Sequence, residues 1–234
     1  MSFILMVAVV IHLPLLLMKL PLKSYDTNFH IFFASHYVHH WFNPWNVKWF
    51  AGFSQTTYPP LSQQWVAIAS WFVGLTMGYM VVQFAAILLL AVGVYRFSLL
   101  WVSPRAASMA ALASVLMGSE SFLVYNAGQL ATTCAAPIYL LALPYLYEWL
   151  RYGSGRAFLK ALVLFSAAAA AHHATLIFGA VLFALPVVAL AWMDREESEE
   201  SSSSGFAFRF FAIVVVSAFA IALVLLPFWV GLYK

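Results

Sequence analysis

The chain is dominated by long apolar runs that contain no charged side chain. Residues 49–95, 121–147 and 161–193 form runs of 47, 27 and 33 residues without Asp, Glu, Lys or Arg. About 20 apolar residues are enough for a helix to cross the hydrocarbon core of a bilayer. Spanning strands would instead show segments of about ten residues with alternating polarity, which this chain lacks. The pattern therefore predicts an all-α, polytopic bundle of transmembrane helices.

Seven apolar segments are expected to be spans. The pair Ser103-Pro104 before the third segment is typical of a helix N-cap followed by a first-turn proline. The segment 21–78 is expected to be the first extracytoplasmic loop with interfacial helices, and the acidic and serine-rich segment 194–205 a cytoplasmic loop. We expect a single transmembrane domain, 1–234, with spans at 3–20, 79–102, 105–123, 130–150, 157–171, 175–193 and 206–232.

Residues 61–77 can be assigned either to an eighth span or to a helix in the membrane interface. With seven spans and the N-terminus inside, seven Lys and Arg face the cytoplasm and four face the other side, in agreement with the positive-inside rule. An eighth span improves the charge bias slightly, but it moves the segment around Asp26 into the cytoplasm. Charge alone does not decide between the two assignments.

Composition narrows the class of protein further. Of 234 residues, 65% are hydrophobic and 8% are charged, whereas roughly a quarter of the residues in soluble domains are charged. This excludes a soluble domain, a disordered chain and a nucleic-acid-binding protein. The single Cys134 lies in an apolar run, so neither a disulfide framework nor a cysteine metal site is expected.

The loop after the first span combines an acid, several aromatic rings and a double proline. It resembles the first extracytoplasmic loop of the GT-C glycosyltransferases, and most closely the prokaryotic membrane proteins labelled 6-pyruvoyl-tetrahydropterin synthase-related. In GT-C proteins the stretch after the double proline is commonly a membrane-surface helix, which favours seven spans. The residues that carry the resemblance are Tyr25-Asp26-Thr27-Asn28-Phe29-His30, Trp45, Trp49, Gly52-Phe53, Tyr58-Pro59-Pro60-Leu61, Tyr95-Arg96, Ser103-Pro104-Arg105-Ala106, Asn126-Ala127-Gly128-Gln129-Leu130 and His172-His173-Ala174-Thr175.

The resemblance implies transfer of a sugar from a polyprenyl-phosphate donor at the extracytoplasmic face of the inner membrane. Asp26 would be the acceptor's base, or the first ligand of a divalent metal ion. Family members are usually longer, so this chain resembles an N-terminal portion whose partners would be the sugar lipid, membrane lipids and further membrane segments. No nucleic acid is expected.

Seven other side chains are candidate substrate-binding residues. In the seven-span arrangement several polar groups fall at the outer ends of different spans, where they are costly unless they share partners or a ligand. We therefore predict one extracytoplasmic cavity, open toward lipid and lined by aromatic rings, in which His30 orients the Asp26 carboxylate. The residues concerned are His30, Trp45, Trp49, Tyr58, Glu120, Gln129 and His172.

Each of these residues also has a simpler interpretation. Asp26 or Thr27 would merely cap the following helix. Glu120 would be an interfacial charge at a helix end. His36 and His40, four residues apart, could bind zinc but more simply lie among lipid headgroups. The chain as a whole could be a non-catalytic scaffold or assembly subunit, or a transporter, although the two related halves of many transporters are absent.

Overall fold

The computed structural model describes residues 1–55, 58–195 and 203–230, and it is almost entirely helical. Within these residues, five helical segments are long and apolar enough to cross a membrane. They are α4 (Leu75–Ser98), α5 (Pro104–Leu116) continued by α6 (Gly118–Ser121) and η2 (Phe122–Ala127), α7 (Leu130–Tyr152), α9 (His173–Gly179) continued by η3 (Ala180–Ala184) and α10 (Leu185–Arg195), and α11 (Ser203–Val230). The protein therefore has the architecture of a membrane-embedded helical bundle.

Two shorter helices lie where the remaining two spans were expected. They are α1 (Ser2–Leu17), with 16 residues, and α8 (Gly155–Ala171), with 17 residues. At 1.5 Å per residue such helices measure about 25 Å, slightly less than the roughly 30 Å of the hydrocarbon core. The count of seven spans is therefore not confirmed by helix length.

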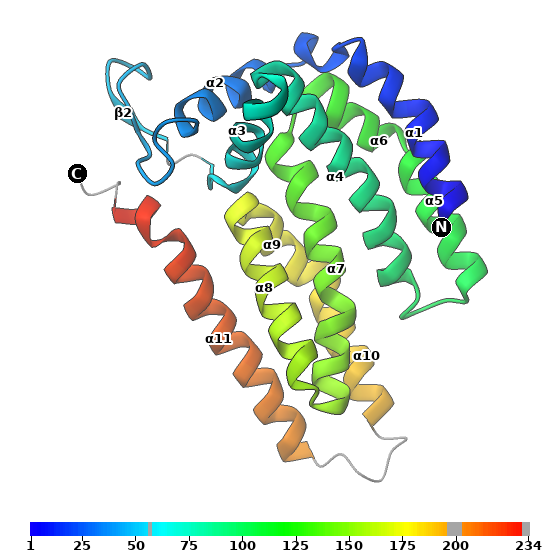
Figure 1. Ribbon diagram of the computed structural model, residues 1–234. Helices are drawn as coiled ribbons and strands as arrows, with labels where there is room; N and C mark the ends of the chain where they lie inside the picture. The colour runs from blue at the N-terminus through cyan, green and yellow to red at the C-terminus, as the bar shows by residue number, and fades with distance from the viewer. Residues whose placement is uncertain (56–57, 196–202, 231–234) are drawn as a thin grey trace.

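The segment between α1 and α4 folds over one end of the bundle (Figure 1). It contains η1 (Leu20–Lys23), α2 (Thr27–Tyr37), the two-residue strands β1 (Trp45–Asn46) and β2 (Phe53–Ser54), and α3 (Leu61–Val73). The strands form an antiparallel hairpin in which Trp45 pairs with Ser54. The expected segment 21–78 thus forms a cap of short elements. Of the expected loop 194–205, residues 196–202 lie outside the described residues.

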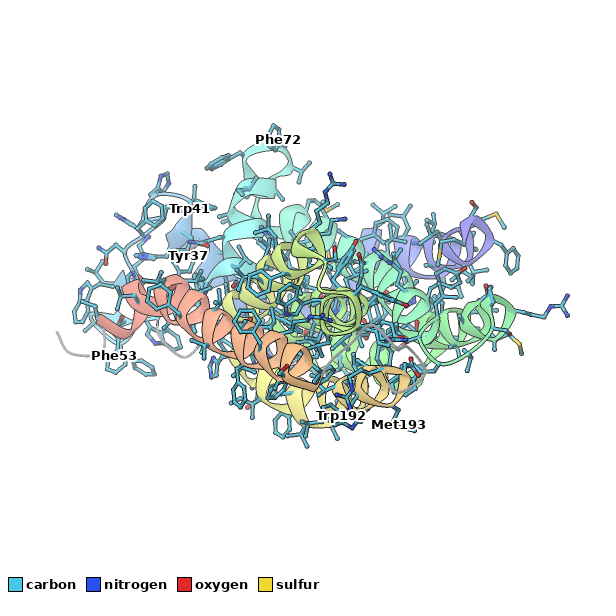
Figure 2. All side chains as sticks on the ribbon, turned by 90° about the horizontal axis from the view of Figure 1, so that it is seen from below. Tyr37, Trp41, Phe53, Phe72, Trp192 and Met193 are labelled. Carbon is cyan, nitrogen blue, oxygen red and sulfur yellow. The ribbon has the colours of Figure 1, made fainter. Side chains whose placement is uncertain are left out.

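The helix α3 is separate from α4 and short. It ends at Gly74, whose φ of +77° turns the chain, and its 13 residues measure about 20 Å at 1.5 Å per residue. Its first turn is buried in the cap, whereas Trp71 and Phe72 near its other end are exposed. Seen from below, α3 points outward from the bundle, with Phe72 at its outer end (Figure 2). This arrangement agrees with the interfacial helix favoured for 61–77 and not with an eighth span.

Local sequence explains two features of the third span. Ser103 accepts a hydrogen bond from the Ala106 amide at the start of α5, with Pro104 in the first turn, as predicted. The helix breaks at Met117, which leaves the Val115 carbonyl without its helical partner. The Nε2–H of His12 donates to this carbonyl (3.0 Å), and its Nδ1 is bonded to the Tyr125 hydroxyl (2.8 Å). Both nitrogens of the buried His12 ring are therefore bonded to the third span.

Close packing of α4 on α7 holds the two clusters of the core together. At Gly93 an added Cβ would lie 3.0 Å from the Pro137 carbonyl oxygen, so glycine permits the contact between the two backbones. Small residues at helix contacts are the usual means by which membrane helices approach one another. The two buried apolar clusters, one around α4 and the other around α7, α8 and α10, therefore form a continuous scaffold beneath the cap.

Candidate functional site

Two loops far apart in the sequence are joined at the capped end of the bundle. The backbone amides of Tyr25 and Asp26 donate to the carbonyls of Asn126 and Ala127, each at 3.0 Å. Between them lies Gly128, with a φ of +71°, and a Cβ there would lie 2.4 Å from the Ser24 Oγ. Only glycine fits this position, and the junction brings the start of α2 against the start of α7.

The carboxylate of Asp26 is bound across this junction. Asp26 occupies the N-cap position of α2, yet its side chain makes no capping hydrogen bond. Instead, the Gln129 amide donates to Asp26 Oδ2 at 2.5 Å. The Thr27 hydroxyl donates to the Tyr79 hydroxyl. The simpler interpretation of Asp26 or Thr27 as a helix cap is therefore wrong, and one carboxylate oxygen of Asp26 has no described hydrogen bond.

His30 lies one helical turn beyond Asp26 and is fully buried. Its Nδ1 is bonded to the Gln63 side chain at 3.2 Å. The Gln63 amide is best oriented with its oxygen toward this nitrogen and its NH2 group toward the carbonyls of Pro59 (3.1 Å) and Pro60 (3.2 Å). Burial, and secondarily His172, lowers the pKa of His30 to about 4, so the ring is neutral at neutral pH. The expectation that His30 orients Asp26 is not met, because Gln129 binds that carboxylate.

Tyr58 and His172 complete the group of polar side chains. The ring of Tyr58 lies 5.2 Å from that of His30 and 6.1 Å from that of His172. Burial and the nearby Asp26 charge raise the pKa of Tyr58. The Nδ1 of His172 is bonded to the Thr175 hydroxyl (2.8 Å), and burial lowers the pKa of His172. We call Asp26, His30, Tyr58, Gln129 and His172 the polar cluster.

Three predicted residues lie outside the polar cluster. The ring of Trp49 packs on Phe29 and Phe33 of α2, so it approaches Tyr58 only through Phe29. Trp45 is 47% exposed in the hairpin, where its ring packs against Gly52. Glu120 is buried in α6, and no hydrogen bond is described between its carboxylate and the cluster. Of the three expected lining rings, only Tyr58 contacts the cluster.

A different cavity opens within the bundle, beneath the polar cluster. It has a volume of about 600 Å³ and lies between α7, α8, α9, η3, α10 and α11. Its lining is almost wholly apolar. Leu176, at its boundary, follows His172 by one helical turn. Other lining residues are Tyr139, Phe165, Val181, Phe210 and Ile221.

Sequence reasoning missed the residues that position the cluster. Gln63 fixes the orientation of His30, while Thr132 and Thr175 contact His172. The double proline gave a signal for Gln63, since the carbonyls of Pro59 and Pro60 hold its amide. The rings of His36 and His40 stack at 4.8 Å. Among the described residues, no three His, Cys, Asp or Glu side chains are grouped so that they could by themselves hold a metal ion.

No family model matches this chain, and neither curated proteins nor solved structures include a match to it.

Proposed function

We propose that this protein is a GT-C-like membrane glycosyltransferase, or a module of one, that transfers a sugar from a polyprenyl-phosphate carrier to an acceptor hydroxyl group. The observation that carries the proposal is the setting of Asp26. Its carboxylate is bound on one side by Gln129, is not used as a helix cap, and lies close to Tyr58. A half-buried carboxylate with an available oxygen is suited to accept a proton.

The proposed reaction is a displacement at the anomeric carbon of the donor sugar. The acceptor oxygen forms a bond to this carbon while the bond from the carbon to the carrier phosphate oxygen breaks. Asp26 accepts the proton of the acceptor hydroxyl through the oxygen that Gln129 does not bind. The electron pair of the broken bond leaves on the carrier phosphate. His30 and Tyr58 shield this step from water, which would otherwise compete as the acceptor.

The apolar cavity supports a lipid-linked donor. It lies one helical turn below His172, so a donor lipid with its hydrocarbon chain beside α11 would hold its sugar next to the cluster. The lining offers almost no polar atom, as burial of a hydrocarbon chain requires. In this proposal the cluster binds the acceptor, and the cavity binds the hydrocarbon chain of the donor lipid.

We place the capped end of the bundle outside the cytoplasm, in the inner membrane. Seven basic residues lie at the other end, on α4, α5, α7, α8, α10 and α11, whereas Lys19, Lys23 and Lys48 lie at the capped end. The positive-inside rule favours this orientation. We also propose that α1 and α8 cross the membrane with local thinning of the bilayer, which restores seven spans and the GT-C-like arrangement. The seven residues are Arg96, Arg105, Arg151, Arg156, Lys160, Arg195 and Arg209.

Cysteine labelling in intact cells tests this orientation. In a background with Cys134 replaced by serine, cysteines at Ser54 and Gln129 should react with a membrane-impermeant maleimide added outside. Cysteines at Ser103 and Ser154 should react only after the cells are opened, because they lie in the turns at the basic end. The same is expected at Ser202, which is outside the described residues. Reaction of Ser54 only from the cytoplasmic side would contradict the orientation.

The proposed function is tested by reconstituting the protein in liposomes with polyprenyl-phosphate monosaccharides that carry a labelled sugar. We expect the label to leave the carrier in the presence of the correct donor, either onto an acceptor from a membrane extract or, more slowly, onto water. If the protein is folded but the label stays on the carrier with every donor, the proposed sugar transfer is contradicted and a non-catalytic scaffold is favoured. Movement of the intact labelled lipid between leaflets would indicate a transporter.

A further inference from the structure

The buried ring of His30 carries one nitrogen with no described partner. The Gln63 amide is held by the carbonyls of Pro59 and Pro60, so its oxygen faces Nδ1 of His30 and requires a proton there. A neutral imidazole has only one N–H group, so Nε2 carries the lone pair. This nitrogen is inaccessible to solvent and has no hydrogen bond within the described part of the chain. Such atoms are rare in proteins, because most buried polar atoms are satisfied.

The His30 ring that carries this lone pair lies beside two other members of the polar cluster. The two nitrogens of an imidazole ring point in nearly opposite directions, so Nε2 faces away from Gln63. Beyond its own helix, the described ring contact of His30 is with Tyr58 at 5.2 Å, and His172 lies within electrostatic range. Tyr58 is only half-buried, so a ligand that displaces its ring from His30 gains access to Nε2.

The cluster is rich in hydrogen-bond acceptors and poor in positive charge. Asp26 offers a carboxylate oxygen, and His30 offers a lone pair. No lysine or arginine is among the partners that the structure describes for these side chains. Phosphate groups need cations or N–H donors, whereas neutral hydroxyl groups donate to acceptors of this kind.

We infer that the polar cluster receives a neutral, hydroxyl-rich ligand of the sugar or polyol class, with one hydroxyl donating to His30 Nε2 and another to Asp26, and that it does not receive a phosphate group. This inference deepens the proposed function, on which it rests for the assignment of the ligand as the sugar acceptor. It gives His30 a role in binding that is separate from proton transfer, and it gives Gln63 the role of fixing the tautomer.

Nitrogen NMR of the full chain tests this inference. The protein is labelled with ¹⁵N-histidine, placed in nanodiscs and titrated with a panel of methyl hexosides or with inorganic phosphate. We expect His30 to show a protonated Nδ1 and an unprotonated Nε2, and a methyl hexoside to shift only the Nε2 signal. The His12 signals serve as an internal control, since both of its nitrogens are already bonded within the bundle.

Two variants separate binding from folding. His30→Phe keeps a ring of similar size and should weaken hexoside binding by roughly tenfold, the usual cost of one buried hydrogen bond. His36→Phe is the matched control on the same helix, because the His36 Nε2 is bonded to the Asn43 carbonyl, and it should leave binding unchanged.

Three outcomes would overturn the inference: an Nε2 that is protonated in the free protein, no response to any hexoside, or a response to phosphate. Because all three are read on the wild-type chain, they hold even if His30→Phe does not fold. Hexoside binding without sugar transfer would contradict the proposed reaction but would still support the inference. Sugar transfer without hexoside binding would support the proposed reaction and contradict the inference.

Discussion

Replacement of Gly128 by alanine is expected to destabilise the protein by about 3 kcal/mol or more, and to separate Asp26 from Gln129. The new Cβ would lie 2.4 Å from the Ser24 Oγ and 2.7 Å from the backbone nitrogen of Thr27. Neither neighbour can move freely. The Ser24 hydroxyl begins a buried chain of hydrogen bonds through Thr27 and Tyr79 back to the Gly128 carbonyl. Backbone strain and a clash in a packed junction each cost on the order of 1–3 kcal/mol.

Gly74→Ala provides a control for a glycine of positive φ in open space. Gly74 also has a positive φ, +77°, but nothing lies within 4 Å of the site of its missing Cβ. Its ψ of 162° lies in a region that essentially only glycine adopts, so this variant measures backbone strain without a clash, on the order of 1–3 kcal/mol. Thermal unfolding of both variants in the same detergent measures the difference. A cost for Gly128→Ala of only about 1 kcal/mol, that of an αL backbone without a clash, would show that the junction between the two loops is not tightly packed.

The second large effect is expected for Asp26→Asn in the transfer assay. The asparagine amide cannot take up the proton from the hydroxyl group of the acceptor substrate. The rate of sugar transfer should therefore fall by roughly 100-fold or more, the usual contribution of a general base. Asparagine has the same shape, and its side-chain oxygen can still accept the hydrogen bond from Gln129. Folding and membrane insertion should therefore be unchanged, as measured by thermal unfolding and size-exclusion chromatography.

Asp194→Asn is the matched control for the loss of a carboxylate. Asp194 lies at the basic end of α10 and accepts a hydrogen bond from the Tyr147 hydroxyl, far from the polar cluster along the bundle. Its replacement should leave the transfer rate within about twofold, as expected for an exchange away from the reacting groups. Wild-type transfer by Asp26→Asn would remove Asp26 from the proposed mechanism and leave the cluster as a binding site only.

The hydrophobic pattern predicted most of the helices because each depends on its own residues. The start of α5 at Pro104 follows from Ser103 and Pro104 alone. The third span was expected to be continuous, but it breaks at Met117, because His12 from α1 satisfies the Val115 carbonyl freed there. Breaks of this kind depend on a partner from another helix, and periodicity in one segment does not reveal them.

The polar cluster was predicted only in part, because its contacts also depend on residues from distant segments. Asp26 and Gln129 lie 103 positions apart in the sequence, and the neighbours of Asp26 suggested helix capping and a contact with His30, not a hydrogen bond from Gln129. Trp45 was placed in the site because aromatic rings suit sugars. The hairpin instead turns its ring outward, beyond a tip where Phe50 and Ala51 adopt positive φ. Neither residue type signals that conformation, so the direction of the hairpin was not predictable from the sequence.

The last helix, α11, forms one wall of the apolar cavity, while every member of the polar cluster precedes it in the chain. Near its start, Arg209 donates to the carbonyls of Leu150 and Arg151, and its own carbonyl accepts from Trp149. During synthesis the earlier helices are delivered first. Until α11 inserts, the apolar wall formed by α7, α8 and α10 faces the bilayer, and α11 then covers one side of it. A hydrocarbon chain can therefore enter sideways from the bilayer before the last wall is in place, and the opening that remains lets donor lipids exchange in the finished protein.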